Sequence, residues 1–369
     1  MRKENKILII SEDDNVFSFL KAQLDSSTYD ILFQKFHPEK IQEILNRNFI
    51  SLLLYESNGE DLTEIQLLHK LLSKKSIPIW VCPTLTKISD QFLENLYELG
   101  ISDLYIKFST LEVLKRKIEK HFKNSTRLQG LNLANKHILS LLSRPPDVPS
   151  LDIGIKYQPK DVIGGDFYDF FVTDKQSLII VLGDVTGHGI QAAVIQTMAR
   201  KVIQMALKSA PTVMEGLKQA HKELYQDLPS GNFVALLVAE WIPSTGSLQF
   251  YRLGTPHPIL KSKNEVFTLL SNGSVLGLLP EDQFNKTDLL PLVIELDVGD
   301  MLLLHTDGLI ESVAKDGSLF GMEGLTEVMQ KTDIKELAKD IVEEIYNLTE
   351  SSVGKISDDL TCIVLKRVL

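Results

Sequence analysis

Four short acidic motifs in the last two-thirds of the chain carry residue types that bind metal ions. Each places an aspartate beside residues that turn the chain at the end of an apolar run. Carboxylates brought from several strand ends to one place repel one another unless a cation neutralises them. Oxygen ligands without a cysteine favour magnesium or manganese over zinc. In chain order the motifs are GGDFYD (164–169), GDVTGHG (183–189), HTDG (305–308) and SDDLT (357–361).

An aspartate beside a glycine is also ordinary turn chemistry, so any one of these motifs alone would more often be a turn than a ligand. Four of them in this order favour the metal site. The histidines near the motifs have simpler interpretations. His257 lies between two prolines, and His305 precedes its aspartate on an expected strand and points away from it. We interpret both as structural residues.

The elements that must position the motifs differ between the two ends of the chain. From residue 151 onward extended apolar runs predominate, and helical patterns occupy about 190–208, 211–227 and 334–348. Strands in blocks with helices in pairs predict an α+β sandwich of two sheets covered by helices. Residues 5–123 instead alternate five apolar runs with amphipathic segments, which predicts a flavodoxin-like α/β domain with a parallel sheet.

A junction separates these two regions. The segment 126–142 has a helical pattern, and the prolines of SRPPDVPS end it. An apolar seam with one polar residue could pair this helix with a second copy of the chain, giving a homodimer. An amphipathic helix packed on its own domain fits the same spacing about equally well. We expect three parts, 1–123, 124–150 and 151–369. The seam residues are Leu128, Leu131, Asn135, Ile138 and Leu142.

Length and composition restrict the class of protein. The chain has 369 residues, which suggests two domains, and a net charge of −10, which argues against a nucleic-acid partner. Its two cysteines lie in apolar runs and are interpreted as small buried residues in a reducing compartment. The apolar run near the N-terminus is too short for a secretion signal, and no window is long enough to span a membrane. We therefore expect a cytoplasmic protein.

Together the motifs resemble the type 2C (PPM-type) metal-dependent protein serine/threonine phosphatases, in particular their bacterial SpoIIE/RsbU-like branch. The resemblance covers roughly residues 126–369. It implies a four-layer α-β-β-α sandwich with two Mn2+ or Mg2+ ions in a channel at one edge. The runs that carry it are YQPKDVIGGDFYD, GDVTGHGIQAAV, GTPHPIL, GDMLLLHTDGLIES and SDDLTCIVL.

The resemblance also implies the metal ligands. Asp184 would bridge the two ions, and the backbone carbonyl of Val185 would bind the same ion as Asp166. Asp307 and Asp358 would hold the other ion.

Several neighbouring residues have open roles. Asp359 could replace Asp358 as a ligand, because the sequence alone does not decide which of the two adjacent aspartates binds the metal. His188 could protonate the leaving serine oxygen, or could be a turn residue that supports its loop. Asp169 is interpreted as a structural carboxylate. Eukaryotic members position the substrate phosphate with an arginine, whereas here Lys160 is the cation nearest to GGDFYD.

The N-terminal region resembles a response-regulator receiver domain whose chemical positions have changed. A receiver needs an acidic pair, an aspartyl phosphoacceptor, a hydroxyl residue and a lysine, each after a successive strand. A glutamate is a poor substitute for the phosphoacceptor, so we expect the fold to persist while phosphotransfer is lost. The positions fall on Ser11 and Glu12 or Glu12 and Asp13, on Glu56 or Tyr55, on Pro83 beside Thr84, and on Lys107.

The resemblance implies an enzyme regulated by its receiver-like domain. Its substrate would be a phosphoserine or phosphothreonine on an STAS-type anti-sigma-factor antagonist, which is then free to bind the anti-sigma kinase. The alternative is a catalytically silent adaptor that recruits a partner of the same pathway, but the survival of all four motifs favours the enzyme. An active phosphorelay receiver is disfavoured by Glu56 and Pro83.

Overall fold

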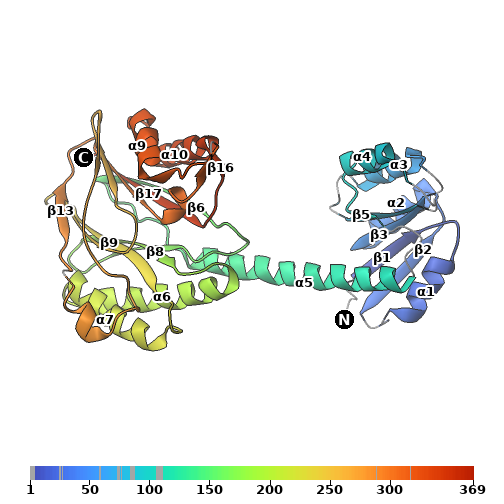
Figure 1. Ribbon diagram of the computed structural model, residues 1–369, viewed down its shortest axis with the longest axis horizontal. Coiled ribbons are helices and arrows are strands. Elements are labelled where there is room, and N and C mark those ends of the chain that lie inside the picture. Colours follow the sequence, from blue (N-terminus) through green and yellow to red (C-terminus); the bar gives the residue numbers. More distant parts are fainter. Residues whose placement is uncertain are drawn as a thin grey trace. The chain divides into compact units, whose positions relative to one another are not determined.

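The computed structural model describes residues 5–24, 26, 28–57, 60–72, 75, 77–83, 88–104, 111–287, 289–315 and 317–369. The chain forms two compact units, Met1–Gln129 and Gly130–Leu369, which run from blue to cyan and from green to red in Figure 1. We refer to them as the N-terminal unit and the C-terminal unit. Within the described ranges, no helix combines the length and apolar character needed to cross a membrane.

The N-terminal unit is built on five parallel strands in the order β2-β1-β3-β4-β5. This is the strand order of flavodoxin-like folds. The strands are β1 (Asn5–Ile10), β2 (Tyr29–Gln34), β3 (Leu52–Ser57), β4 (Ile79–Pro83) and β5 (Asp103–Leu104). The helices between them are α1 (Asn15–Gln23), α2 (Pro38–Arg47), α3 (Thr63–Leu72) and α4 (Asp90–Glu98).

Helices cover both faces of this sheet, because successive side chains of a strand point to opposite sides. Leu8 and Ile10 of β1 pack against residues of α2, α3 and α4. Ile7 and Ile9 pack on the other face, against α1 and the first turns of α5 (Leu111–Leu141). The core of the unit therefore lies on both sides of β1 and β3.

The last turns of α5 belong to the C-terminal unit. Ile138 is buried there against Ile163 and Ala193, and Leu131 packs on the same cluster. Leu142 packs against the core beneath the next helix. Most of the predicted apolar seam is thus used within the unit, which is the second of the two alternatives that the spacing allowed.

The C-terminal unit contains two five-stranded antiparallel sheets. The first has the order β13-β10-β9-β8-β7 and the second the order β12-β11-β14-β17-β6. The strands of the first sheet are β7 (Phe167–Val172), β8 (Leu178–Val185), β9 (Val234–Ile242), β10 (Ser247–Leu253) and β13 (Leu292–Glu295). Those of the second are β6 (Leu151–Gln158), β11 (Ile259–Ser262), β12 (Glu265–Thr268), β14 (Met301–His305) and β17 (Leu360–Arg367).

Alternation along the strands arranges the unit in four layers. Ile179 and Val181 of β8 face α6 (Gly189–Ser209) and α7 (Val213–Asp227), whereas Ile180 and Leu182 face the second sheet. Leu303 of β14 faces α9 (Gly321–Lys331) and α10 (Ala338–Ser352). Figure 1 shows one helix pair on each outer side of the two sheets. This is the α-β-β-α sandwich that the resemblance implied.

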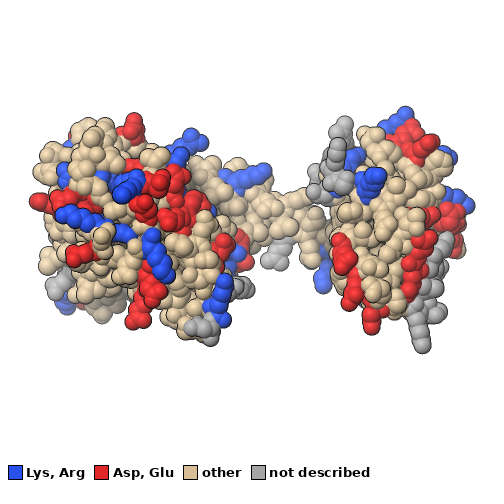
Figure 2. Space-filling view, turned by 90° about the horizontal axis from the view of Figure 1, so that it is seen from above, with Lys and Arg blue, Asp and Glu red and all other residues tan. Residues whose placement is uncertain are grey.

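Shorter elements complete the C-terminal unit, namely α8 (Glu281–Phe284), the 3-10 helix η1 (Asp307–Leu309), and the two-stranded sheet of β15 (Val313–Ala314) and β16 (Val353–Lys355). On the face shown in Figure 2, lysine and arginine side chains of this unit are interspersed with aspartate and glutamate. Among the described residues on that face, no basic stripe follows the surface as a nucleic-acid backbone would require.

Candidate metal centre

Strand pairing brings the four acidic motifs to one edge of the sandwich. In the first sheet, Phe167 at the start of β7 pairs with Gly183 near the end of β8, so GGDFYD and GDVTGHG lie side by side. In the second sheet, His305 at the end of β14 pairs with Cys362 near the start of β17, which joins HTDG to SDDLT. We call Asp166, Asp184, Asp307 and Asp358 the acidic site.

Asp166 connects the two sheets. Its side chain is buried, and its Oδ2 accepts hydrogen bonds from the hydroxyl groups of Thr306 at 2.8 Å and Thr361 at 2.6 Å. These two threonines belong to the HTDG and SDDLT motifs, so one carboxylate holds three motifs together. Its Oδ1 is buried without a hydrogen-bond partner among the described residues. A buried oxygen of this kind suits a cation.

The carboxylates of the acidic site oppose one another's ionisation. Burial raises the pKa of Asp184, and the charges of Asp166, Asp307 and Asp358 raise it further. Burial also raises the pKa of Asp166. The pKa of Asp307 rises to about 6, first through burial and then through the charges of Glu311 and Asp358. A divalent cation would remove this mutual repulsion.

The donor set fits a hard cation such as magnesium or manganese, because its members are carboxylate oxygens. The carboxylates do not yet surround one point. Within the described ranges, no three acidic, histidine or cysteine side chains lie close enough to form a ready-made metal site. An ion bound here would therefore have to draw the carboxylates closer together.

The neighbours Asp358 and Asp359 differ in their surroundings. Asp359 is buried, and its two carboxylate oxygens accept hydrogen bonds from the backbone N–H groups of Lys160 at 2.8 Å and Gly165 at 2.7 Å. A Cβ atom at Gly164 would lie 2.7 Å from the same carboxyl group, so a glycine is required there. The half-buried Asp358 accepts a 2.8 Å hydrogen bond from the backbone N–H of Asp359.

The carbonyl of Val185 lies against the GGDFYD loop. A Cβ atom at Gly165 would approach the Val185 carbonyl oxygen to 2.9 Å, so the second glycine of the motif makes room for this contact. The loop that carries Asp166 and the strand end that carries Asp184 therefore touch through backbone atoms.

The histidines occupy three different environments. His188 is the N-cap residue of α6, its side chain is 69% exposed, and its Nδ1 lies 3.8 Å from an Asp161 carboxylate oxygen. His305 is fully buried with Nδ1 3.0 Å from the Thr306 carbonyl, and burial lowers its pKa to about 4. His257 accepts a 3.4 Å hydrogen bond from the backbone N–H of Ser271. None of these contacts joins a histidine to the acidic site.

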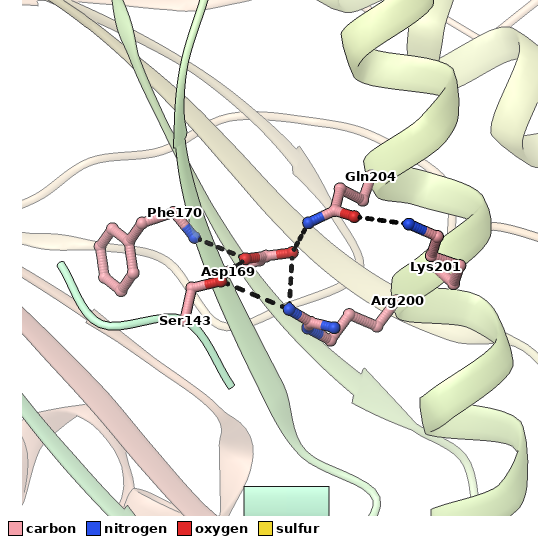
Figure 3. Close-up of polar contacts among 6 residues, drawn as sticks. All are labelled: Ser143, Asp169, Phe170, Arg200, Lys201 and Gln204. Atoms are coloured by element: carbon pink, nitrogen blue, oxygen red, sulfur yellow. Dashed lines mark hydrogen bonds and ion pairs between the residues drawn. The ribbon is translucent and has the colours of Figure 1, made fainter. Parts of the chain in front are cut away.

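Asp169, the second aspartate of GGDFYD, lies in a separate buried cluster (Figure 3). Its Oδ2 lies 3.1 Å from the Arg200 guanidinium and accepts a 2.8 Å hydrogen bond from Gln204, and its Oδ1 accepts one from Ser143. Arg200 thus lies near GGDFYD, although sequence proximity pointed to Lys160. The feature that could have pointed to Arg200 is its place among the buried residues of α6, where an arginine needs a partner.

In the N-terminal unit, two of the positions that the receiver resemblance singled out are in contact with each other. The hydroxyl of the buried Ser11 donates a hydrogen bond to the Glu56 carboxylate, so the first and third strand ends meet as they would in a receiver. Tyr55 is buried in the core and donates to Glu64, which favours Glu56 over Tyr55 at the phosphoacceptor position.

The other positions that this resemblance singled out do not take part in the hydrogen bond between Ser11 and Glu56, where they are described. An oxygen of Glu12 lies 3.7 Å from the ammonium group of Lys35. The backbone N–H of Asp13 donates to Ser11, and Pro83 ends β4. Lys107 and Thr84 lie outside the described residues.

The chain matches known proteins in sequence and in structure. Residues 174–368 match the family model described as Stage II sporulation protein E (SpoIIE). Phosphoserine phosphatase RsbU of Bacillus subtilis (strain 168) is 25% identical over 310 residues, which are 82% of this chain and 86% of RsbU.

Two solved structures share the fold. The RsbU and RsbW domains of a Mycobacterium tuberculosis protein give a TM-score of 0.53 at 24% identity and cover 62% of each chain. The PP2C phosphatase domain of SpoIIE from Bacillus subtilis, with a fragment of its regulatory domain, gives 0.52 at 17% identity. That match covers 60% of this chain and 64% of the solved one. This chain therefore spans less than two-thirds of either solved chain.

Proposed function

The chain belongs to the SpoIIE family of protein serine/threonine phosphatases, and we propose that it is a Mn2+- or Mg2+-dependent member that acts on a small signalling protein. The substrate would be a phosphoserine or phosphothreonine of an STAS-type anti-sigma-factor antagonist. The observation that carries the proposal is the acidic site itself, to which both sheets contribute aspartates and where burial and neighbouring charges raise the pKa values of Asp184 and Asp307.

Each residue of the site has a proposed task. Asp184 would help to hold both ions, Asp166 and the Val185 carbonyl would hold one of them, and Asp307 and Asp358 would hold the other. When bound, the ions supply Lewis acidity and charge neutralisation for in-line attack of water on phosphorus. Asp359 is a positioning residue, because both of its oxygens already hold the backbone of the GGDFYD loop.

We propose His188 as the group that protonates the leaving oxygen. It follows the loop that carries Asp184 and stands at the N-terminus of α6. Its exposed imidazole could meet a substrate serine at the mouth of the site. Replacing His188 with Asn should lower kcat more for a phosphoserine peptide than for an aryl phosphate, whose phenolic leaving group needs less protonation.

The N-terminal unit is proposed to regulate the phosphatase without a phosphoryl group of its own. Ser143 follows α5 by two residues and hydrogen-bonds both Asp169 and Arg200. A change in the path of α5 would therefore reach β7 and α6, which flank the acidic site. A homodimer would use the exposed side of α5, where Leu128, Leu133 and Leu139 lie, because the seam residues Leu131 and Ile138 pack inward.

Hydrolysis of a phosphoserine peptide by the full-length protein tests the proposed function. We expect release of phosphate with added manganese or magnesium, and loss of release when a chelator is in excess. Activity that persists in excess chelator would contradict metal dependence. Metal-loaded protein that binds a phosphorylated antagonist without releasing phosphate would support the adaptor instead.

A further inference from the structure

A cavity of about 300 Å3 opens beside the acidic site. It lies between the GTPHP loop (254–258), which connects β10 to β11, and the segment that follows β14. Asp307 of the acidic site forms part of its wall, together with Glu311 and Arg252. The cavity therefore combines a proposed metal ligand with an arginine from a different strand, and none of the roles assigned above uses it.

Arg252 is held in a fixed orientation at this wall. Its Nε donates a 2.8 Å hydrogen bond to the Ser271 carbonyl, and its Nη1 donates a 2.6 Å hydrogen bond to the Thr255 carbonyl. Two carbonyl contacts fix the plane of the guanidinium, which carries five N–H donors. The remaining donors have no partner among the described residues. Because Arg252 is half-buried and lines the cavity, these donors are available to a ligand inside it.

The rest of the wall determines what kind of ligand fits. Glu311 and Asp307 would repel an anion, so an anionic ligand in the cavity needs the positive charge of Arg252. Ile310 and Met322 add an apolar surface that can contact the carbon atoms of a substrate side chain. A planar guanidinium binds phosphoryl and carboxyl oxygens through paired, charge-assisted hydrogen bonds. Of these two groups we favour the phosphoryl group, because the cavity lies next to Asp307 and the proposed reaction at phosphorus would occur there.

We propose that this cavity seats the phosphorylated side chain of the substrate and that Arg252 binds one of its phosphoryl oxygens. The proposal rests on the proposed phosphatase function and adds to it a binding residue on β10. Arg252 would then bind the phosphoryl group in place of Arg200, which lies near GGDFYD but is paired with the buried Asp169.

Binding of inorganic phosphate to the manganese-loaded full-length protein is the direct test, measured by titration calorimetry. Arg252→Gln should weaken phosphate binding about 10- to 100-fold, because a charge-assisted hydrogen bond is lost. It should lower kcat/KM for a phosphoserine peptide by a similar factor. Lys286→Gln removes the same charge from an exposed position of the unit and should change neither quantity. Unchanged phosphate affinity in a folded Arg252→Gln protein overturns the proposal.

A second pair of variants covers the case in which Arg252→Gln does not fold, because Arg252 also holds two backbone carbonyls. Met322→Glu places a negative charge in the cavity wall, and Met322→Gln is the neutral control of similar size. Phosphate affinity should fall in Met322→Glu and remain near wild type in Met322→Gln. Equal affinities in the two variants would also overturn the proposal.

Two further outcomes have distinct meanings. If Arg252→Gln weakens the binding of peptides with an acidic residue beside the phosphoserine but leaves phosphate binding unchanged, the arginine binds a carboxylate and the proposal is wrong. If the wild-type protein shows no phosphatase activity, the proposed function fails. The calorimetric comparison still decides whether Arg252 binds phosphate.

Discussion

Both units bring acidic residues to the ends of neighbouring strands. The two sets differ in what surrounds their carboxylates: other carboxylates in the C-terminal unit, and a hydroxyl donor in the N-terminal unit. In the C-terminal unit, burial raises the pKa values of Asp166 and Asp184, and the charges of neighbouring aspartates raise them further. In the N-terminal unit a serine occupies the equivalent meeting point, and its hydroxyl donates to Glu56. A carboxylate with a hydroxyl donor needs no cation, whereas a group of carboxylates does.

The N-terminal unit has the strand order of flavodoxin-like folds, and its strands β1 and β3 are paired. The pair Ser11–Glu56 is satisfied by its own hydrogen bond and stabilises the unit without a ligand. The acidic site is instead unfavourable without a ligand, which is the condition expected of a residue set retained for function.

The largest expected effect is on the acidic site. Asp184→Asn should lower phosphatase activity at least about 10³-fold, because it removes the carboxylate proposed to bridge two ions. The same change should raise the thermal midpoint of the metal-free protein, since one repelling charge is gone. Asp282→Asn, at an exposed position of the same unit, is the control. Equal activity of wild type and Asp184→Asn would contradict the assignment.

The next prediction distinguishes the roles of the neighbouring residues Asp358 and Asp359. Asp358→Asn should weaken manganese binding about 10- to 100-fold and leave the thermal midpoint of the metal-free protein unchanged or higher. Asp359→Asn should lower that midpoint, with a loss of about 1–3 kcal/mol in the free energy of unfolding. The reason is that an amide has one oxygen and cannot accept from both Lys160 and Gly165. Calorimetry and thermal unfolding measure the two effects. Exchange of the two outcomes would reverse the proposed roles.

A smaller effect concerns acid sensitivity of the C-terminal unit. His221 stacks on Phe284, donates through Nε2 to the Leu279 carbonyl, and accepts at Nδ1 from the N–H of Gly277. These contacts require the neutral ring, and burial lowers its pKa. The unfolded state therefore binds more protons below about pH 6.5, so stability is lost as the pH falls below that value.

The variant His221→Gln isolates this contribution, because Asp307, whose pKa is raised to about 6, changes charge in the same pH range. The unfolding free energy of the wild type should fall more steeply between pH 7 and pH 5 than that of His221→Gln. The difference in slope should not exceed about 1.4 kcal/mol per pH unit. Parallel profiles in denaturant titrations would show that His221 does not contribute.

The smallest expected effect is in the N-terminal unit, where we predict no stable phosphorylation. Acetyl phosphate or a histidine kinase should add no phosphate to the intact protein, because the acceptor position holds Glu56 and the hydroxyl position holds Pro83. Intact-mass measurement detects one added phosphoryl group. Label on Glu56, Tyr55 or Asp13 would remove the contrast between the two units.

The sequence led us to expect that the four motifs meet, because each lies at or next to a strand end. The motifs lie in pairs on two sheets, and the hydrogen bonds of Asp166 to Thr306 and Thr361 join the pairs. The sequence could not show which of Asp358 and Asp359 binds metal. Adjacent side chains point in opposite directions, and the direction of Asp359 depends on the N–H groups of Lys160 and Gly165, which are distant in sequence. Arg252 was missed because its place at the cavity depends on carbonyls at Thr255 and Ser271.

Some elements also escaped prediction for local reasons. Helix α9 begins at Gly321 and contains Gly324, and glycines lower helix propensity, so packing against α10 must stabilise it. The seam of α5 was ambiguous because a coiled coil and a helix on its own domain need the same spacing. Ile138 packs against Ile163 and Ala193 of its own unit, as the second interpretation expects.

Titration of the metal-free protein with manganese tests the central claim most directly, because it counts the ions that the acidic site holds. Calorimetry on the wild type should show two ions per chain and release of protons on binding, since carboxyl groups with raised pKa values must ionise. Asp184→Asn should lose at least one of the two ions while remaining folded. No manganese binding by the wild type, or identical titrations of both proteins, would contradict the account.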